Sequence, residues 1–379
     1  MSPSPSVSPI ALAAEVADRI RSSRWSADSD GHGDTDWEAL ARRVFEMQRR
    51  RIEPLARWCA RRGVPVAEEV PLWRLPAAPS IAWKAFDLSC AGTPARIFQT
   101  SGTSVGAARG RAAYSSAGLA LMDAAIDVNA ARMLFPSGRT SRILALAPSP
   151  ETDPGRIMSY GLARLGSSFG SEPTRFFVGP SGLDLDAAIE ALATSSADGT
   201  AVTLVGATFA MPPLLDRIAD RHGRLPLPSG SAIMDAGGMK AHGATLEPAA
   251  LRARVSDVLD VPSHACVNLL GMTELASQHY DDRLAAHAEN RAPGRGKRPP
   301  PWCRVWAVDP ETLEPLPNGV TGVLRHMDLA NVERPAFVQT DDLGCTHADG
   351  TFEILGRAEA SEARGCSLDA AEWAARVSA

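Results

Sequence analysis

Short apolar runs alternate with helical patterns between residues 97 and 275, and this alternation restricts the fold more than any other feature. The apolar runs cover residues 97–98, 142–147, 175–178, 201–206, 231–235 and 265–270. The helical patterns between them cover residues 116–133, 160–169, 185–194, 211–222 and 251–259. Strands that alternate with helices predict a mostly parallel sheet with helices packed against its faces. We therefore expect an α/β fold built around such a sheet.

The segments on either side of this region have different patterns. Residues 10–22 predict a helix, and 37–62 predict one long amphipathic helix that ends at Gly63, ahead of a proline-rich connection over 64–80. On the other side, short strands are expected at 303–308, 322–327, 336–340 and 351–355, followed by a helix at 368–377. Strands joined by short glycine and proline turns are typical of an antiparallel sheet. A smaller antiparallel β subdomain is therefore expected after the α/β region.

The composition excludes several classes of protein. A formal net charge of -5 offers no electrostatic footprint for a nucleic-acid partner. No apolar run reaches the roughly 18–20 residues of a membrane span, and the start of the chain lacks the basic segment of a signal peptide. The six cysteines are scattered and form no Cys-x-x-Cys pair, which favours reduced thiols over a disulfide framework or a zinc site. We expect a cytoplasmic protein.

A run of hydroxyls and glycines over residues 99–110 directly follows the first apolar run. Glycine lets backbone N–H groups approach an anion closely, the hydroxyls between Thr100 and Ser104 add donors, and Arg109 adds a positive charge. The Gly-Lys-Ser/Thr of a Walker loop is absent. This run is interpreted as a phosphate-binding loop, with an ordinary polar surface loop as the alternative.

Three further stretches place glycines, hydroxyls or carboxylates at the ends of expected strands. They are 235–240 with Gly237, Gly238 and Lys240, 271–274 with Thr273 and Glu274, and 340–344 with Asp341 and Asp342. Open α/β sheets bind ligands beyond the carboxyl ends of their strands. Each stretch alone is also compatible with a structural turn. Jointly they indicate a nucleotide site, with a hydroxyl loop for phosphates, a glutamate for magnesium and an aspartate for ribose.

The order of these stretches resembles the adenylate-forming superfamily of acyl-CoA synthetases, luciferases and adenylation domains. Longer motifs look like its acyl-protein synthetase branch, the long-chain-fatty-acid–luciferin-component ligases of bacterial bioluminescence. These motifs are Pro300–Val305, Asp309–Pro317, Arg325–Asn331, Gln339–Gly344 and Gly356–Ser367. The resemblance covers roughly residues 80–375 and is most specific in its last third.

The resemblance implies that the chain binds ATP and Mg²⁺. The β- and γ-phosphates of ATP would be held by Thr100, Ser101, Gly102, Thr103 and Ser104. Thr273 would bond to the α-phosphate, and Glu274 would be the ligand to Mg²⁺. Gly237 and Gly238 would pass along the adenine. Asp342 would bind the ribose hydroxyls, with Arg357 beside it.

Cys366 matches the C-terminal cysteine that the acyl-protein branch acylates. Arg364 and the start of the expected helix would both lower the pKa of its thiol, the alternative being an inert core cysteine. In the implied reaction a carboxylate attacks the α-phosphorus to give an acyl-adenylate, and a thiolate then displaces AMP to give a thioester. The remaining five cysteines are expected to be inert.

The resemblance does not decide which molecule finally accepts the acyl group, or whether the chain catalyses the reaction at all. In the bioluminescence relatives an acyl reductase takes the acyl group, whereas here a carrier protein, CoA or an amine could accept it. The competing hypothesis is a non-catalytic subunit that binds a nucleotide or acyl-AMP. The identity of the acid, fatty or aromatic, is not indicated.

Two departures from the superfamily pattern affect the expected site. Val105 makes the hydroxyl loop one residue longer, and Arg109 stands where lysine is usual. The mobile C-terminal domain that supplies a catalytic lysine in most members is not expected in this chain, and Lys240 is the suggested substitute. For the acyl pocket, Phe209 and Met211 are expected either to line its wall or to belong to the core.

Together these inferences divide the chain into four segments. They are an N-terminal tail with helices (1–80), an α/β nucleotide- and acyl-binding core (81–290), an antiparallel β subdomain (291–355) and a short C-terminal segment with Cys366 (356–379). Residues 291–298, which are rich in cations, are expected to form a solvated loop.

Overall fold

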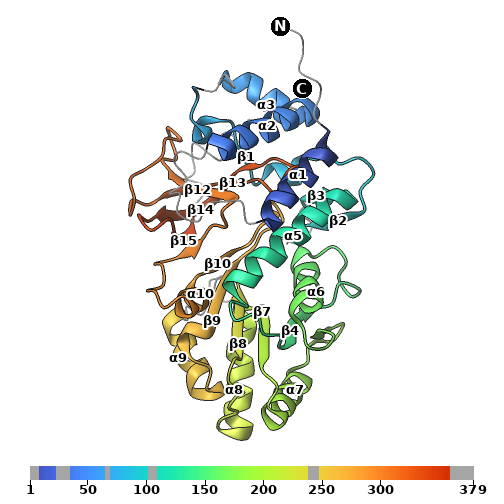
Figure 1. Cartoon of the computed structure of the whole chain (residues 1–379), viewed down its shortest axis with the longest axis vertical. Helices are drawn as coiled ribbons and strands as arrows, with labels where there is room; N and C mark the ends of the chain where they lie inside the picture. Colours follow the sequence, from blue (N-terminus) through green and yellow to red (C-terminus); the bar gives the residue numbers. More distant parts are fainter. Residues whose placement is uncertain (1–7, 23–34, 65–68, 101–108, 238–246, 359–379) are drawn as a thin grey trace. The chain divides into compact units, whose positions relative to one another are not determined.

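The computed structural model describes residues 8–22, 35–64, 69–100, 109–237 and 247–358 (Figure 1). The chain divides into two compact units, which are treated separately below. The first unit contains residues 1–125, 272–277 and 298–379, and the second contains residues 126–271 and 278–297. Among the described helices, none combines the length and the apolar composition that crossing a lipid bilayer requires.

The second unit is built on a parallel sheet, as the alternation of strands and helices predicts. Its five parallel strands, from one side to the other, are β5 (Arg175–Gly179), β4 (Arg142–Pro148), β7 (Val202–Ala207), β8 (Ala232–Ala236) and β9 (Cys266–Leu270). Two short antiparallel strands flank them, β6 (Gly182–Leu183) and β10 (His279–Asp281). The prediction of a mostly parallel α/β sheet is confirmed for this part of the chain.

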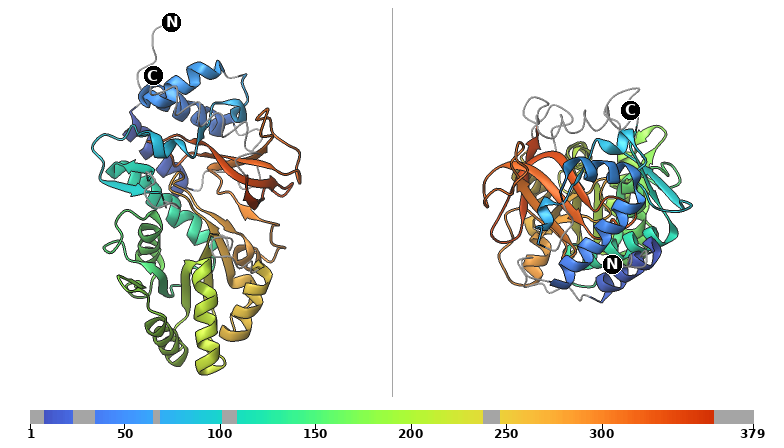
Figure 2. Two further views of the ribbon diagram at one scale, coloured as in Figure 1. Left: turned by 180° about the vertical axis from the view of Figure 1, so that it is seen from behind. Right: turned by 90° about the horizontal axis from the view of Figure 1, so that it is seen from above.

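The helices of the α/β part of the chain alternate with these strands, and α5 belongs to both units. They are α5 (Ser116–Met133), α6 (Ile157–Phe169), α7 (Leu185–Asp198), α8 (Met211–His222), α9 (Pro248–Leu259) and α10 (Arg283–Ala288). The Asp184 carboxylate accepts a hydrogen bond from the Ala187 N–H at 3.0 Å and caps α7. Helices α7, α8 and α9 lie side by side along the sheet (Figures 1 and 2). Their apolar faces and the strands form one buried core.

The first unit contains the predicted antiparallel sheet. Its strands pair in the order β12 (Cys303–Val308), β13 (Gly322–Asp328), β14 (Phe337–Thr346) and β15 (Phe352–Arg357), and β1 (Ala78–Pro79) pairs with β14 in parallel. The expectation that residues 340–342 lie at a strand end is wrong. They lie inside β14, because this long strand pairs with β13 over its first part and with β15 over its second.

The hydroxyl loop leaves from a hairpin rather than from the parallel sheet. Strand β2 (Arg96–Gln99) pairs antiparallel with β3 (Arg111–Tyr114), and these two strands form a separate sheet. The expectation that the apolar run at residue 97 opens the parallel sheet is therefore wrong. Its partner is the strand directly beyond the loop, and edge-to-face contact between Phe98 and Tyr114 packs the hairpin.

The helices before this hairpin are α1 (Pro9–Arg21), α2 (Thr35–Arg51), α3 (Glu53–Arg62) and α4 (Ala82–Ala85), with a 3₁₀ turn, η1, at Leu72–Arg74. The single helix expected over 37–62 is wrong. The helix breaks at Ile52, whose φ is -102° and ψ 97°. Pro54 explains the break, because it has no N–H to continue the helical hydrogen bonds and fits the first turn of a new helix. Gly63 ends α3 in the left-handed conformation, as predicted.

Candidate active site

Asp342 and Arg357 face each other across the β14–β15 ladder as directly paired residues. The Arg357 Nε donates to the Asp342 Oδ1 at 3.3 Å. The two side chains differ in exposure, because the Asp342 side chain is 13% exposed and that of Arg357 76%. Burial raises the pKa of the Asp342 carboxyl, and the positive charge of Arg357 acts against this rise. The pair presents a buried acceptor beside an accessible cation.

The loop that follows β9 brings Thr273 and Glu274 to the hydroxyl-loop hairpin. Thr273 is buried, and its Oγ1 lies 3.5 Å from the carbonyl oxygen of Gln99, the last residue of β2. Thr100 comes next in the chain. Two of the predicted phosphate-binding elements therefore meet within the first unit. The Glu274 carbonyl oxygen accepts a hydrogen bond from the Asn331 Nδ2 at 2.7 Å, which fixes the backbone at this position.

The Asp328 carboxylate anchors the rest of this loop. Its Oδ2 accepts hydrogen bonds from the backbone N–H groups of Ala276 at 3.0 Å and Ser277 at 2.8 Å. Its Oδ1 accepts from the Ser277 hydroxyl at 2.8 Å, and the Trp302 Nε1 donates to that same hydroxyl. Asp328 and Asn331 belong to the motif Arg325–Asn331. The physical role of this motif, which sequence reasoning missed, is to hold the loop that carries Thr273 and Glu274.

Glu274 lies among charges from three other elements. Burial raises the pKa of its carboxyl, Arg357 and Lys84 act to lower it, and Asp342 acts to raise it further. Lys84 also acts on Asp341, where burial raises the pKa and Arg357 and Lys84 oppose the rise. These charges converge on one region of the first unit, where two cations offset the carboxyl groups of the buried Asp342, the half-buried Glu274 and the more exposed Asp341.

Lys84, in α4, was not among the residues that sequence reasoning selected. Its electrostatic effect on Glu274 and Asp341 depends on tertiary structure, so spacing along the chain gives no sign of it. One signal was available. The chain contains three lysines, Lys84, Lys240 and Lys297, among 39 lysines and arginines. A lysine in a chain that otherwise uses arginine is a reasonable candidate for a specific role.

Thr100 closes the base of the hydroxyl loop. Its Oγ1 accepts a hydrogen bond from the Gly110 N–H at 2.8 Å, and its N–H donates to the Gly110 carbonyl at 2.9 Å. A Cβ on Gly110 would lie 3.0 Å from atoms of both Thr100 and Trp83, so glycine suits this close approach. Arg109 is exposed at the end of the loop. Ser101, Gly102, Thr103 and Ser104, together with Val105, lie outside the described residues.

In the second unit, Gly237 adopts a φ of 92° directly after β8. The neighbouring Asp235 Oδ2 accepts hydrogen bonds from the Thr208 Oγ1 at 2.6 Å and the Asn268 Nδ2 at 2.7 Å. Burial raises the pKa of the Asp235 carboxyl. Gly237 therefore lies where the ends of β8 and β9 are tied together, and its positive φ is a conformation that favours glycine. Gly238 and Lys240 lie outside the described residues.

The expectation that residues 291–298 form a solvated loop is wrong for Lys297. Lys297 is buried, its Nζ donates to the Asn268 side chain and backbone, and it lies 3.5 Å from the Asp281 Oδ1. Burial lowers the pKa of its ammonium group. Arg291 contacts the buried carboxylate of Asp282 at 2.8 Å. The Asp281 carboxylate, at the end of β10, explains why Lys297 leaves solvent, whereas Arg291 stays partly exposed beside Asp282.

The two pocket candidates have different environments. Met211 is 1% exposed and belongs to the core of the second unit, whereas Phe209 is 50% exposed. Cys366 lies outside the described residues. Among the other cysteines, burial raises the pKa of Cys59 and Cys266 to about 12 and that of Cys90 to about 11, which keeps these thiols protonated.

Comparison with known families agrees with the site motifs. The model of the family described as "Acyl-protein synthetase, LuxE" matches residues 169–373, which is more than half of the chain. The chain belongs to the LuxE acyl-protein synthetase family. The matched range includes Gly237, Thr273, Glu274, Asp342 and Arg357, and it also includes Cys366.

Curated relatives of this LuxE-family chain match it over short regions. It is 39% identical over 75 residues to the long-chain-fatty-acid–luciferin-component ligase of Vibrio harveyi, covering 18% of this chain and 20% of that protein. It is 37% identical over 83 residues to the ligase of the same name from Aliivibrio fischeri, covering 20% of this chain and 22% of that protein. The matches therefore span about a fifth of the relatives' own length.

Solved structures share the fold over most of the chain. An open conformation of 2-hydroxyisobutyryl-CoA ligase in complex with 2-HIB-AMP and CoA has a TM-score of 0.62 at 15% identity, over 88% of this chain and 79% of that chain. The same ligase in its postadenylation state has a TM-score of 0.61 at 14% identity, over 88% of this chain and 71% of that chain. The fold is that of adenylate-forming enzymes.

The anchoring role of Asp328 predicts the effect of replacing it by asparagine. In Asp328→Asn an amide nitrogen replaces one acceptor, so a buried donor at Ala276 or Ser277 loses its partner. We expect the free energy of unfolding to fall by about 2–4 kcal/mol. Hydrogen exchange measured over residues 272–277 should become faster under native conditions.

Asp309→Asn is the matched control, because the Asp309 Oδ1 also accepts backbone N–H bonds, from Glu311 and Thr312, at an exposed turn. This variant should leave both the stability and the exchange over 272–277 unchanged. Exchange in Asp328→Asn at the wild-type rate would contradict the anchoring role.

Proposed function

We propose that this chain is an ATP-dependent, AMP-forming ligase that activates a carboxylic acid as an acyl-adenylate and transfers the acyl group to a thiol. The observation that carries the proposal is the grouping of Thr273 and Glu274 with the Asp342–Arg357 pair in one unit, within the part of the chain that matches the LuxE family. Thr100, at the base of the hydroxyl loop, belongs to the same group.

The residues around Glu274 fit a magnesium ion. Carboxylate oxygens are preferred ligands of Mg²⁺, which is usually bound by one or two carboxylates together with substrate phosphates. Burial disfavours the ionised form of Glu274 and raises the pKa of its carboxyl. A bound divalent cation would offset this free-energy cost of burying the carboxylate. Glu274 would hold the ion, which when bound would neutralise charge on the phosphates.

The first half-reaction requires positioning more than a general base. The carboxylate oxygen of the acid attacks the α-phosphorus of ATP, the bond to the β-phosphate breaks, and pyrophosphate leaves with its electron pair. Asp342 would hold the ribose hydroxyls, and Thr273 would bond to the α-phosphate. Such transfers depend on alignment and charge neutralisation. The anchoring of the 272–277 loop by Asp328 would fix Thr273 relative to the nucleotide.

Lys84 is proposed as a cation for the first half-reaction, alongside the suggestion of Lys240. Lys84 is exposed and acts electrostatically on both Glu274 and Asp341, so its ammonium group is available to a polyanion in this region. A compact, flexible ammonium can follow the charge that moves to the leaving pyrophosphate.

In the second half-reaction the proposed acceptor is the thiol of Cys366. Its thiolate would attack the acyl carbon, the bond from that carbon to the phosphate oxygen would break, and AMP would leave. The resulting thioester could pass to an acyl reductase, the partner that the family resemblance implies. Transfer to CoA, a carrier protein or an amine is a separate outcome of the tests below.

The first prediction concerns adenylation. Pyrophosphate release from ATP, measured with a panel of fatty and aromatic acids, should depend on the acid and on Mg²⁺. Glu274→Gln should lower kcat by about 100-fold or more, because it removes the charged ligand at the reacting phosphates. Glu311→Gln, at an exposed position, should match wild type. Absence of release with every acid would favour a non-catalytic nucleotide-binding subunit.

The second prediction concerns Lys84. Lys84→Met should lower kcat/KM for ATP by about tenfold or more, and Lys84→Arg should recover part of this loss, because it restores the charge with a different shape. Arg139→Met, which removes an exposed cation in the second unit, is the control and should have no effect. Equal activity of Lys84→Met and wild type would remove Lys84 from the mechanism.

The third prediction concerns the acceptor. Incubation with ATP, Mg²⁺ and a radiolabelled acid should leave a hydroxylamine-sensitive label on the wild-type protein and none on Cys366→Ser. Cys266→Ser, which changes a buried thiol, should be labelled like wild type. Equal labelling of Cys366→Ser and wild type would exclude acylation of Cys366 while leaving the adenylation step intact.

A further inference from the structure

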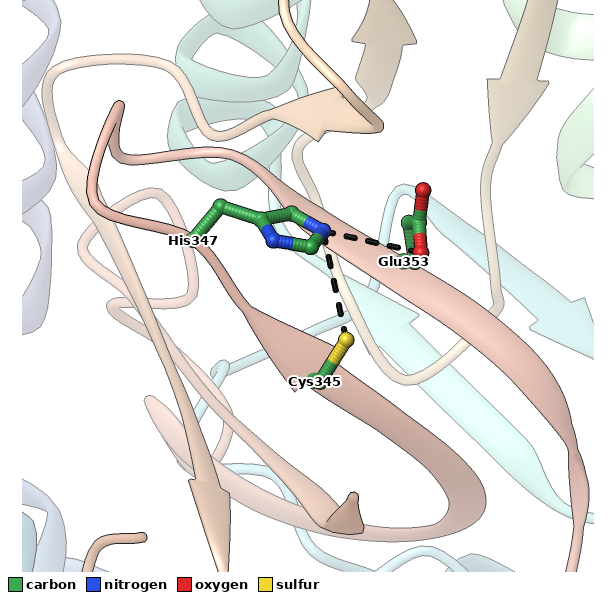
Figure 3. A group of neighbouring side chains, drawn as sticks. All are labelled: Cys345, His347 and Glu353. Atoms are coloured by element: carbon green, nitrogen blue, oxygen red, sulfur yellow. Dashed lines mark hydrogen bonds and ion pairs between the residues drawn. The ribbon is translucent and has the colours of Figure 1, made fainter. Parts of the chain in front are cut away.

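A thiol, an imidazole and a carboxylate converge at the closed end of the β14–β15 hairpin. Within the described part of the chain, Cys345, His347 and Glu353 form a group whose ligand atoms all lie within 4.8 Å of one another (Figure 3). The Cys345 Sγ lies 3.9 Å from the His347 Nε2, and the same nitrogen lies 3.5 Å from the Glu353 Oε2. None of these residues has a part in the proposed ligase reaction.

The hairpin itself brings these side chains together. Cys345 and His347 are two residues apart along the chain, so they project to the same side of an extended backbone. Glu353 is the direct cross-strand partner of Cys345 in the β14–β15 ladder. The turn between them closes when the His347 N–H donates to the Thr351 carbonyl at 2.8 Å. The register and the turn therefore fix the positions of all three residues.

The close approach of the two strands depends on Gly344. A Cβ at this position would lie 2.1 Å from the Glu353 carbonyl oxygen and 2.9 Å from a methyl group of Leu324. Only glycine therefore lets the backbone of Glu353 come this near to the strand that carries Cys345.

The way the donor atoms converge distinguishes an ion site from a catalytic relay. In a relay of nucleophile, base and orienting carboxylate, the thiol and the carboxylate contact different nitrogens of the imidazole. Here both approach Nε2. Three atoms that point at one another around a common centre are the arrangement that a bound cation requires, because each donor then directs a lone pair at the ion.

The distances agree with the size of a zinc site. With usual Zn–S, Zn–N and Zn–O bond lengths, a tetrahedral ion separates sulfur from nitrogen by about 3.6 Å and nitrogen from oxygen by about 3.3 Å. The observed separations of 3.9 and 3.5 Å exceed these by a few tenths of an ångström. The third pair, the Cys345 sulfur and the Glu353 oxygen, lies within 4.8 Å. A tetrahedral ion would bring this pair to about 3.6 Å, so an inward movement of up to about 1 Å would complete three bonds.

We propose that Cys345, His347 and Glu353 bind a thiophilic divalent cation, Zn²⁺, with a fourth position open to water. Thiolate, imidazole and carboxylate are the ligand types of zinc, whereas Mg²⁺ and Ca²⁺ require oxygen ligands. Cys345 is 5% exposed and the Glu353 side chain 36%, so the ion would enter from the glutamate side. On binding, the thiol proton is released to solvent as the Zn–S bond forms.

The same hairpin carries the Asp342–Arg357 pair farther along its ladder. An ion that joins both strands near the turn would hold their register, so occupancy of the site would stabilise this pair. The ion would therefore be structural and separate from the magnesium ion proposed for Glu274. The sequence contains no Cys-x-x-Cys pair. A site made of one thiolate, one imidazole and one carboxylate needs no such pair.

The test uses cobalt as a spectroscopic substitute for zinc. Full-length protein treated with a chelator and reduced with a phosphine is titrated with Co²⁺ in the absence of ATP and acid. We expect one equivalent to produce a thiolate-to-cobalt charge-transfer band that Zn²⁺ removes. Cys345→Ser should abolish the band, and His347→Ala should weaken binding roughly 100-fold. Glu353→Gln should weaken it to a smaller extent.

Two thiol variants serve as controls, because cobalt can bind any accessible thiolate. Cys266→Ser and Cys366→Ser should keep the full band. Circular dichroism establishes that each variant is folded, and added Zn²⁺ should raise the Tm of the wild type but not that of Cys345→Ser or His347→Ala. No band in the wild type, or a band that survives in Cys345→Ser and is lost in Cys366→Ser, would overturn the proposal. Since the titration needs no substrate, its result is independent of the ligase activity.

Discussion

The carboxylate of Asp328 is the contact on which the first unit depends most. It lies at the end of β13 and is 1% exposed, yet it accepts two backbone N–H bonds and one hydroxyl bond from the 272–277 loop and a further backbone bond from Ala330. A charged group can be buried at this depth only when hydrogen bonds satisfy its oxygens. The same stretch of chain is tied to helix α2, because Gln48 donates to the carbonyl of Val332 at 3.0 Å. The Asp328 carboxylate thus links the β-sheet to the candidate site, and Gln48 links the turn after β13 to an N-terminal helix.

Much of this fold could be predicted from local signals. The α7 cap at Asp184, the stop at Gly63 and the bounds of α8 follow from residues that act on their own neighbours. The errors occur where a partner distant in the sequence decides the outcome. The buried position of Lys297 depends on Asp281, which the sequence does not place beside it. The error at Ile52 has another cause. Pro54 is a local signal for a helix break, but the apolar residues on both sides of it continue the helical spacing and favour one long helix.

In the candidate site, too, some residues were predicted from the sequence and others were missed because their role depends on distant partners. Thr273, Glu274 and Asp342 were predicted from the order of the motifs. Hydroxyls and carboxylates near glycine are the groups that bind phosphates, metal ions and ribose, so their residue types alone indicate a nucleotide site. Lys84 and Asp328 were missed because one acts through electrostatic proximity and the other through backbone atoms. Neither effect leaves a pattern in the sequence. Motifs thus identify the groups that would touch a ligand better than the groups that hold them in place.

The register of the β14–β15 hairpin has a consequence for how this chain tolerates change. Asp342 pairs with Arg357 and Cys345 pairs with Glu353, so β15 uses one residue more than β14 between the two pairs. The shift near Gly344 absorbs that residue, Leu355, a large apolar side chain that is 49% exposed. Without this shift, the register that pairs Cys345 with Glu353 would set Asp342 opposite Gly356 and move the guanidinium away. A change that removed this shift while keeping every residue would therefore separate Asp342 from Arg357.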